Sequence, residues 1–258
     1  MSPSALQRWQ SFLCQIEERH RQVATDAVVG ARQALPETGF DPQILGQAWA
    51  VVDNRLRELE ERILDTWNDQ VEQVFEREGY DCADCVAARK LGDDLAFRLE
   101  NSRQSLEMQI QAECARTLYD RASKTQKAHS CPRCGGPWTV PLSYQALNLT
   151  CSHCGCVALF EPGMLMRSVL AYGGHALAWQ AASAEWMAMR IAERQYRQAR
   201  SPAPFSVVKD YESAQVAYWT KYCSARAYLE PSMSNIGLEV SSRMQSWYRD
   251  SGEYGRRS

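Results

Sequence analysis

Apolar side chains recur every three or four residues along most of the chain, a spacing that places them on one face of an α-helix. The first stretch, about residues 4–34, has this spacing at Leu6, Trp9, Leu13, Ile16, Val23 and Ala27. The segment ALPETGFDP (34–42) follows, and its Pro36, Gly39 and Pro42 favour a turn. We therefore expect a helix, a turn, and a second helix that begins at Pro42 with Asp41 as its N-cap.

The clearest pattern spans residues 42–78. Its apolar positions are Leu45, Trp49, Val52, Leu56, Leu59, Ile63, Trp67, Val71 and Val74. The first steps alternate between four and three residues, as in a coiled-coil heptad, with Glu and Arg on the outer faces. Three successive steps of four, from Leu59 to Val71, are typical of a stutter, which locally unwinds a supercoil. Gly79 is expected to end this helix, because glycine accepts the left-handed cap conformation.

Residues 81–127 form a third helical pattern, with Asp81 as its expected N-cap. Its expected buried face consists of Leu91, Leu95, Leu99, Ser102, Leu106, Ile110 and Leu118. At 1.5 Å per residue such a helix would be roughly 65–70 Å long, much longer than helices of compact domains. Two long neighbouring helices predict an elongated antiparallel hairpin.

Helical spacing resumes after the middle of the chain. An Ala-rich segment, 164–200, carries Gly173-Gly174, where we expect a kink. SPAP (201–204) is interpreted as a linker, and 205–229 is expected to be a helix that ends before Pro231. Its stripe consists of Val208, Tyr211, Gln215, Tyr218, Tyr222, Ala225 and Leu229. A last helix over about 232–249 would bury Ile236, Val240, Met244 and Trp247, before a frayed tail.

Between these helical regions, at about 128–160, the composition shifts to Pro, Gly, Thr, Val and Leu, and short strands are expected. Two cysteine pairs lie here, Cys131/Cys134 and Cys151/Cys154, in the pattern C-x2-C-x16-C-x2-C. This spacing is typical of a zinc site, because each C-x2-C turn can direct two thiolates at one ion. Trp138, Val140, Leu147 and Leu149 would form a small apolar face.

These residues resemble the zinc-ribbon fold group over about 129–160 only. The resemblance implies structural Zn²⁺ on Cys131, Cys134, Cys151 and Cys154, and it implies no particular activity. Four thiolates fill the coordination sphere, so a catalytic metal is not expected. The same ligands would suit a rubredoxin-like iron site, and unmetallated thiols or disulfides are further alternatives. Cys156 and His153 are additional donors beside the second pair, and we interpret them as a packed thiol and a surface imidazole.

A third C-x2-C motif, Cys82-Ala-Asp-Cys85, lies at the expected start of the long helix. A helix N-terminus lowers the pKa of a thiol, which would suit a redox dithiol. Asp81 and Asp84 would instead raise that pKa, and no thioredoxin-like βαβ pattern surrounds the motif. The alternatives are structural thiols, a redox pair, or a metal site shared with Cys114 or another chain.

The net charge of −2 conceals an uneven distribution. Residues 1–100 hold 11 Lys/Arg and 19 Asp/Glu, whereas 101–160 hold 6 and 3, and 161–258 hold 12 and 9. Nucleic-acid-binding domains are usually more basic than this. However, the candidate contact residues Arg116, Arg121, Lys124, Lys127 and Arg133 adjoin the cysteine pairs. They could bind a protein partner or a polyanion, or they could be a solvated helix end.

Other signals exclude several classes of protein. No apolar run is long enough to span a membrane, and the amino terminus lacks a signal-peptide pattern, so we expect a cytoplasmic protein. No Walker loop, dinucleotide glycine motif, nucleophile elbow or HExxH motif is present. The lone His175 and the aromatic stripe Tyr211, Tyr218, Trp219, Tyr222 and Tyr228 are interpreted as structural.

The sequence therefore predicts a mainly α protein: an elongated helical bundle or coiled-coil hairpins with one inserted small β zinc ribbon. We expect a long-helix region at 1–127, the ribbon at 128–160, and a C-terminal helical region at 161–258 that packs on the first. The leading function is a non-enzymatic zinc-binding scaffold or adaptor for protein–protein assembly. The alternatives are a nucleic-acid-associated regulator and a thiol redox protein using Cys82 and Cys85.

Overall fold

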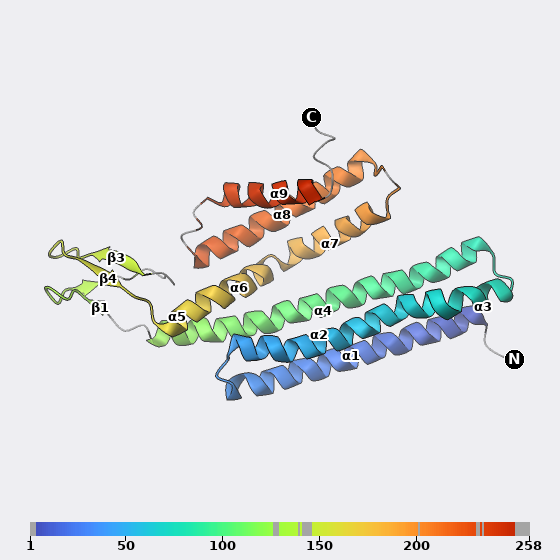
Figure 1. Cartoon of the computed structure of the whole chain (residues 1–258), viewed down its shortest axis with the longest axis horizontal. Coiled ribbons are helices and arrows are strands. Elements are labelled where there is room, and N and C mark those ends of the chain that lie inside the picture. Colours follow the sequence, from blue (N-terminus) through green and yellow to red (C-terminus); the bar gives the residue numbers. More distant parts are fainter. Residues whose placement is uncertain are drawn as a thin grey trace. The chain divides into compact units, whose positions relative to one another are not determined.

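The computed structural model describes residues 4–125, 129–138, 140, 146–200, 202–230, 233 and 235–250. These residues are mainly helical, with two short β-hairpins between helices (Figure 1), which confirms the predicted fold class. The chain divides into two compact units, Met1–Ile110 and Gln111–Ser258, and the division lies within helix α4 (Cys82–Thr125). The borders that we expected at 127 and 160 stay predictions.

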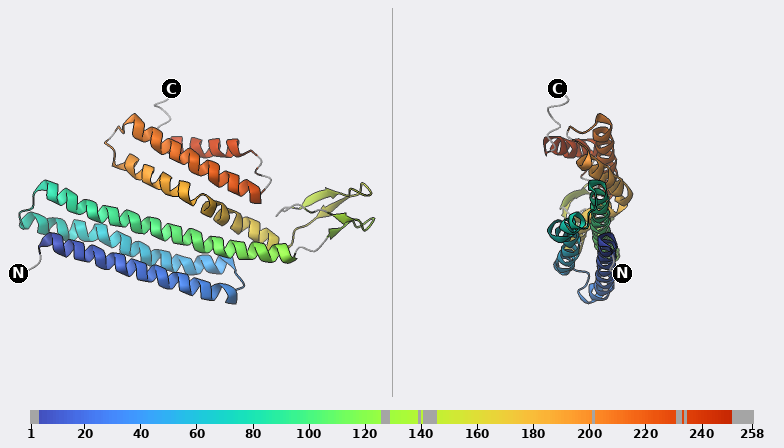
Figure 2. Two further views of the ribbon diagram at one scale, coloured as in Figure 1. Left: turned by 180° about the vertical axis from the view of Figure 1, so that it is seen from behind. Right: turned by 90° about the vertical axis from the view of Figure 1, so that its right-hand side faces the viewer.

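The N-terminal unit contains α1 (Ala5–Glu37), α2 (Pro42–Thr66), the π-helical turn η1 (Trp67–Val71), α3 (Glu72–Arg77) and the first part of α4. α1 and α2 lie side by side (Figures 1 and 2). The core of this unit is built around aromatic rings. Trp9 donates a hydrogen bond from Nε1 to the carbonyl oxygen of Ala88 at 2.9 Å, and its ring contacts that of Trp67. Trp67 in turn contacts Phe75, which is fully buried.

α1 begins at a capping box, in which Ser4 and Gln7 exchange hydrogen bonds. The expectation that Pro36 ends this helix is wrong, because the helix continues to Glu37. Pro36 lies in the last turn of the helix, where its missing N–H removes only one backbone hydrogen bond. Its fixed φ is also compatible with helical geometry. The turn itself uses positive φ at Gly39 (67°) and Phe40 (64°). Asp41 then accepts a hydrogen bond from the Gln43 N–H at 2.8 Å, as expected for the N-cap of α2.

The three steps of four residues in the second helix coincide with an irregularity. The π-helical turn η1, with i→i+5 hydrogen bonding, lies between α2 and α3. It spans Trp67–Val71, which is the last of the three steps of four residues. A π turn holds more residues than an α turn, so apolar side chains four residues apart can stay on one face of the helix. α3 ends before Gly79, whose φ of 80° confirms its expected role.

α4 begins where Asp81 accepts a hydrogen bond from the Asp84 N–H at 2.8 Å, which confirms this N-cap. Leu95 and Leu99 are buried as expected. Leu91 and Ser102 are exposed, so their assignment to the buried face is wrong. Each residue rotates the helix by about 100°, so Leu91 lies about 80° from Leu99 after two steps of four. Ser102, three residues after Leu99, returns by about 60° toward the side of Leu91.

The C-terminal unit contains the end of α4, strands β1 (His129–Ser130), β2 (Pro137–Trp138), β3 (Leu147–Thr150) and β4 (Val157–Phe160), and the remaining helices. These helices are α5 (Met164–Ser168), the π-helical turn η2 (Val169–Gly173), α6 (Gly174–Ala181), α7 (Ser183–Gln198), α8 (Phe205–Leu229) and α9 (Ile236–Asp250). α8 packs against α6, α7 and α9 (Figure 2).

The glycine pair of this unit coincides with the end of η2, where the helix departs from α geometry. A Cβ atom on Gly173 would lie 3.2 Å from that of Ala115, so the two helices pack closely through small residues. α8 has the predicted bounds. α9 begins later than predicted, at Ile236, because Asn235 accepts a hydrogen bond from the Leu238 N–H. Pro231 and the tail 251–258 lie outside the described residues.

Candidate metal centre

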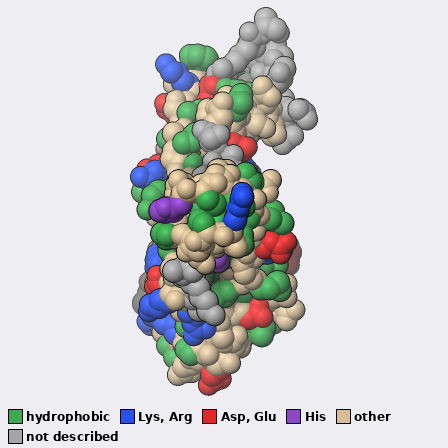
Figure 3. Space-filling view, turned by 90° about the vertical axis from the view of Figure 1, so that its left-hand side faces the viewer, with side chains coloured by type: hydrophobic (Ala, Val, Ile, Leu, Met, Phe, Trp, Pro, Cys, Tyr) green, Lys and Arg blue, Asp and Glu red, His purple; other side chains and the backbone are tan. Residues whose placement is uncertain are grey.

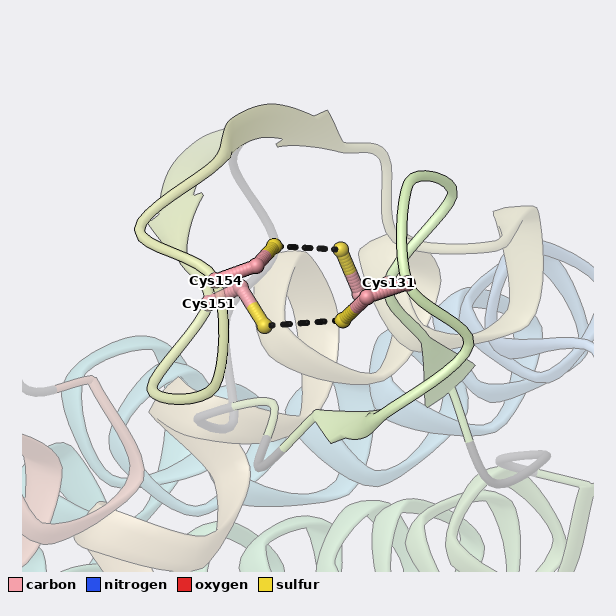
Figure 4. Close-up of side chains that lie close together, drawn as sticks. Cys131, Cys151 and Cys154 are labelled. Carbon is pink, nitrogen blue, oxygen red and sulfur yellow. Dashed lines mark hydrogen bonds between the residues drawn. The ribbon is translucent and has the colours of Figure 1, made fainter.

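Two antiparallel β-hairpins carry the cysteine pairs. β1 pairs with β2, placing His129 opposite Trp138, and β3 pairs with β4, placing Leu147 opposite Phe160. Cys131 follows β1 directly and Cys151 follows β3 directly, so each pair occupies the loop at the end of a strand. Figure 4 shows the two loops facing each other, with the labelled Cys131 on one and Cys151 and Cys154 on the other.

The four sulfur atoms form a compact group. Cys131 Sγ lies 3.7 Å from Cys154 Sγ, and Cys134 Sγ lies 3.7 Å from Cys151 Sγ. All four lie within 4.8 Å of one another. A regular tetrahedron with Zn–S bonds of about 2.3 Å has sulfur–sulfur edges of roughly 3.8 Å. The donor set and its spacing therefore fit a metal ion such as zinc.

Both loops have the same backbone arrangement. Cys131 donates its N–H to Gly136 O and Cys151 donates its N–H to Cys156 O, each at 2.8 Å. Gly135 and Gly155 follow the second cysteine of each pair with φ of 71° and 69°, values that favour glycine. This turn directs backbone donors at sulfur: the N–H groups of Arg133 and His153 lie 3.4 Å from Cys131 Sγ and Cys151 Sγ, respectively.

The four thiols fall into two kinds, those with a lowered pKa and those with a raised pKa. The backbone N–H of Cys134 holds the pKa of Cys131 below its usual value. Burial raises the pKa of Cys151, but the N–H groups of Cys154 and His153 outweigh it and lower the pKa to about 6. Although the Cys156 N–H favours the Cys154 thiolate, burial and the neighbouring sulfurs raise the pKa of Cys154 to about 12. Without a cation, four adjacent thiolates repel each other, and a divalent metal removes this obstacle.

Among the residues that the structure describes, these four cysteines form the one group of three or more side chains whose ligand atoms could hold a metal. Cys131 and Cys151 are buried, whereas Cys134 is exposed and Cys154 lies between. When bound, the ion would cross-link the two hairpins. It would not act on a substrate, because four protein sulfurs leave no open coordination position.

The two additional donors do not join this group. The His153 ring packs over the first loop, since a Cβ atom on Gly136 would lie 2.8 Å from His153 Cδ2. The Cys156 thiol lies 3.7 Å from the carbonyl oxygen of its neighbour Val157. Their interpretation as a surface imidazole and a packed thiol agrees with these contacts.

The Cys82/Cys85 motif has a different setting. Cys82 is exposed, and Cys85 is partly buried against the core of the N-terminal unit. Burial raises the pKa of Cys85. The charges of Cys82 and Glu76 raise it further, as do those of Asp84 and Asp81. Cys85 is therefore a poor nucleophile at neutral pH. Within the described residues, neither Cys114 nor another donor joins the pair in a metal-binding group.

The basic residues have varied surroundings. Arg116 donates a hydrogen bond to Gln180 Oε1 on α6. Arg121, Lys124 and Arg133 are exposed, and Lys127 lies outside the described residues. The role of these residues in contacting a protein partner or a polyanion stays a prediction.

The aromatic stripe of α8 packs in the interior, as interpreted from the sequence. Tyr211, Tyr218 and Tyr222 are buried, whereas Tyr228 is exposed. His175 Nδ1 lies 2.7 Å from the Tyr222 hydroxyl, and burial together with nearby arginines lowers the pKa of His175.

Sequence reasoning missed a buried ionic network in the N-terminal unit. Arg103 donates from Nε to Glu60 Oε1 at 2.9 Å and also pairs with Asp53. His20 Nε2 lies 3.4 Å from the same Glu60 oxygen. His20, Glu60 and Arg103 are all buried. His20 follows Leu13 and Ile16 on the apolar stripe of α1. A polar residue at a core-facing position was the sequence signal that could have revealed this network.

No protein-family model matches the chain, and searches of curated proteins and of solved structures give no significant match. Within the described part of the chain, no helix combines the length and the apolar character needed to cross a membrane.

Proposed function

We propose that the protein is a non-enzymatic, zinc-dependent scaffold or adaptor whose ribbon contacts a protein partner or a second copy of the chain. The observation that carries this proposal is a closed four-cysteine centre beside exposed aliphatic side chains. A metal with four protein ligands stabilises a fold and offers no site for chemistry.

The exposed side chains lie on one face of the β3–β4 hairpin. Val157 is 60% exposed and Leu159 is 59% exposed, and alternate residues of a strand share a face. Their cross-strand partners on this face are the short polar residues Thr150 and Asn148. Figure 3 shows one side of the molecule on which hydrophobic side chains lie among polar and charged ones. Two aliphatic side chains exposed on one face of a hairpin offer an apolar contact for a protein partner.

The experiment compares three variants of the full-length, zinc-loaded protein. The double substitution Val157→Asp/Leu159→Asp changes the proposed contact and leaves the ligands in place. Cys131→Ser removes a ligand, and Val51→Asp is the matched control, because Val51 is 72% exposed on α2. Self-association is measured by analytical ultracentrifugation, and partner binding by quantitative affinity capture.

Both ribbon changes are expected to reduce association by about tenfold or more, whereas Val51→Asp leaves it unchanged. If the ribbon variants associate like the wild-type protein, the ribbon is not the contact surface. If no association of any kind occurs, the scaffold hypothesis is wrong.

A nucleic-acid-associated role is the second proposal, because one stretch of the chain lacks acidic residues. Residues 121–160 contain no Asp or Glu and carry Arg121, Lys124, Lys127 and Arg133. Binding through these cations would weaken steeply with salt. A titration of labelled DNA and RNA at several salt concentrations tests it, and the absence of salt-dependent affinity would reject it.

A further inference from the structure

A groove of about 520 Å³ lies between α1 and α4 in the N-terminal unit. The two helices run parallel here, because Trp9 bonds to Ala88 and Glu17 pairs with Arg98 further along both helices. Such a volume is within the range of small-molecule sites, about 300–1,000 Å³. The groove is therefore large enough for an organic ligand.

One end of the groove carries cations. Arg21 and Arg98 line it, and each currently pairs with an exposed carboxylate. Arg98 Nη2 lies 3.2 Å from Glu17 Oε1, and the two side chains are 60% and 50% exposed. Exposed ion pairs contribute little free energy, so a ligand carboxylate can replace these partners. The planar guanidinium fork also suits a carboxylate geometrically.

The same end has a fixed polar residue that also lines the groove. His20 is 2% exposed, and its Nε2 has no hydrogen bond within the described structure. Glu60 Oε1 lies 3.4 Å from this nitrogen and accepts a hydrogen bond from Arg103 Nε at 2.9 Å. Buried polar atoms nearly always have hydrogen-bond partners, and exceptions concentrate at sites that serve a function. A buried imidazole nitrogen without a hydrogen bond, in the lining of a groove that also carries two arginines, points to a polar ligand group at this end.

The other end of the groove is mainly apolar. Ala24 and Val28 line it from α1, three and seven residues beyond Arg21, and Leu106 lines it from α4, eight residues beyond Arg98. Ser105 and Gln109 add small polar groups at its edge. A ligand that satisfies both ends has a charged head and an apolar body.

We propose that this groove binds an organic carboxylate with an aliphatic tail. The head lies between Arg21 and Arg98 beside His20, and the tail lies along Ala24, Val28 and Leu106. The inference is independent of the proposed scaffold function, since it concerns no residue of the ribbon.

Titration calorimetry of the full-length, zinc-loaded protein with sodium octanoate tests this proposal. 1-Octanol serves as the ligand without the charged head. Arg98→Gln removes one groove cation, and Arg62→Gln is the matched control, because Arg62 is exposed on α2 and does not line the groove. Ser105→Trp fills the groove from α4, and circular dichroism checks that each variant is folded.

Octanoate is expected to bind saturably, and octanol much more weakly. Arg98→Gln should weaken octanoate binding about tenfold, the loss typical of one charged hydrogen bond, and Ser105→Trp should abolish it. Arg62→Gln should change the affinity by less than about twofold. The proposal is overturned if octanoate does not bind saturably, if octanol binds as tightly, or if the two arginine substitutions have equal effects.

Discussion

The N-terminal unit and the zinc-ribbon-like segment stabilise their folds by different means. The unit buries a continuous cluster of large side chains, among them Trp9, Trp67 and Phe75. In the two hairpins, the described residues that are buried are Cys131, Cys151 and Phe160. Burying a large apolar side chain contributes about 1.5–3 kcal/mol, so the unit has an adequate core and the hairpins do not.

The two regions therefore have different means of stabilisation open to them: burial of apolar side chains in one, and a four-cysteine group that could hold a metal in the other. The helical unit has a large apolar core to stabilise it. A segment of two short hairpins needs a cross-link, and the four thiols fit a metal that supplies one. Perturbations should therefore act on one region and spare the other.

The largest effect is expected from removing the metal. A strong chelator, or Cys131→Ser with Cys151→Ser, should unfold β1–β4, because structural zinc supplies on the order of 10 kcal/mol to small domains. Hydrogen exchange by mass spectrometry should show lost protection at 147–160 and unchanged protection in α1 and α2. Cys156→Ser is the control and should have no such effect. Equal protection of the hairpins with and without chelator would contradict the comparison.

The next effect concerns the aromatic core. Phe75 is fully buried between Trp67 and Tyr80, with ring centroids 5.5 and 4.6 Å away. Phe75→Ala should lower the free energy of unfolding of the N-terminal unit by about 4 kcal/mol, through lost burial and the cavity left behind. Chemical denaturation followed by hydrogen exchange of peptides from 1–110 measures this loss. The exposed Val51→Ala should change it by less than about 0.5 kcal/mol, and comparable losses would refute the assignment of the core.

The buried ionic network should have a somewhat smaller effect. Arg103→Ala leaves the carboxylates of Glu60 and Asp53 without their buried cation and should cost about 3 kcal/mol. Arg57→Ala provides the comparison, because Arg57 also pairs with Asp53 but is 55% exposed. Its loss should cost less than about 1 kcal/mol. The same exchange measurement distinguishes them, and similar costs would mean that the network is solvated.

The smallest effect concerns Glu107. Burial, followed by the charge of Asp53, raises the pKa of its carboxyl. A raised carboxyl pKa means that the folded unit binds the proton more tightly, so stability is lost as pH rises from the ordinary value of about 4.3 through the raised one. Above that window Glu107→Gln should stabilise the unit slightly, by about 0.5 kcal/mol, because the residue is partly solvated. Denaturation at several pH values tests this, and a gain that persists below pH 4 would refute it.

Local signals predicted most of the helices. Asp41 and Asp81 cap helices as expected, Gly79 ends one, and α8 has the predicted bounds, because each feature depends on its immediate neighbours. Pro36 was misassigned because the cost of a proline depends on its position in the last turn. Leu91 was misassigned because a stripe read in steps of four drifts around the helix, and Ser102, three residues after Leu99, returns to the side of Leu91.

The two polar sites differ in how far the sequence predicted them. The four cysteines were found from spacing alone, since both pairs lie in short loops that determine their own geometry. The network of His20, Glu60 and Arg103 joins three helices, and its partners are 40 or more positions apart in the sequence. A local sequence pattern does not indicate which polar residues of different helices will contact one another. The three-dimensional packing of the helices is needed to identify this network.

The π-helical turn at Trp67–Val71 has a consequence for insertions and deletions. A π turn holds one residue more than an α turn, so deleting Asn68 would convert it to regular helix. Because the wider turn already absorbs that extra residue, the side chains beyond the deletion would keep nearly the same angular positions relative to the preceding helix. Phe75 would stay on the side that faces the core, whereas deleting one residue from the regular part of α2 would rotate Phe75 by about 100°. The unit should therefore tolerate the loss of one residue within this turn, but not the loss of one residue from the regular helix before it.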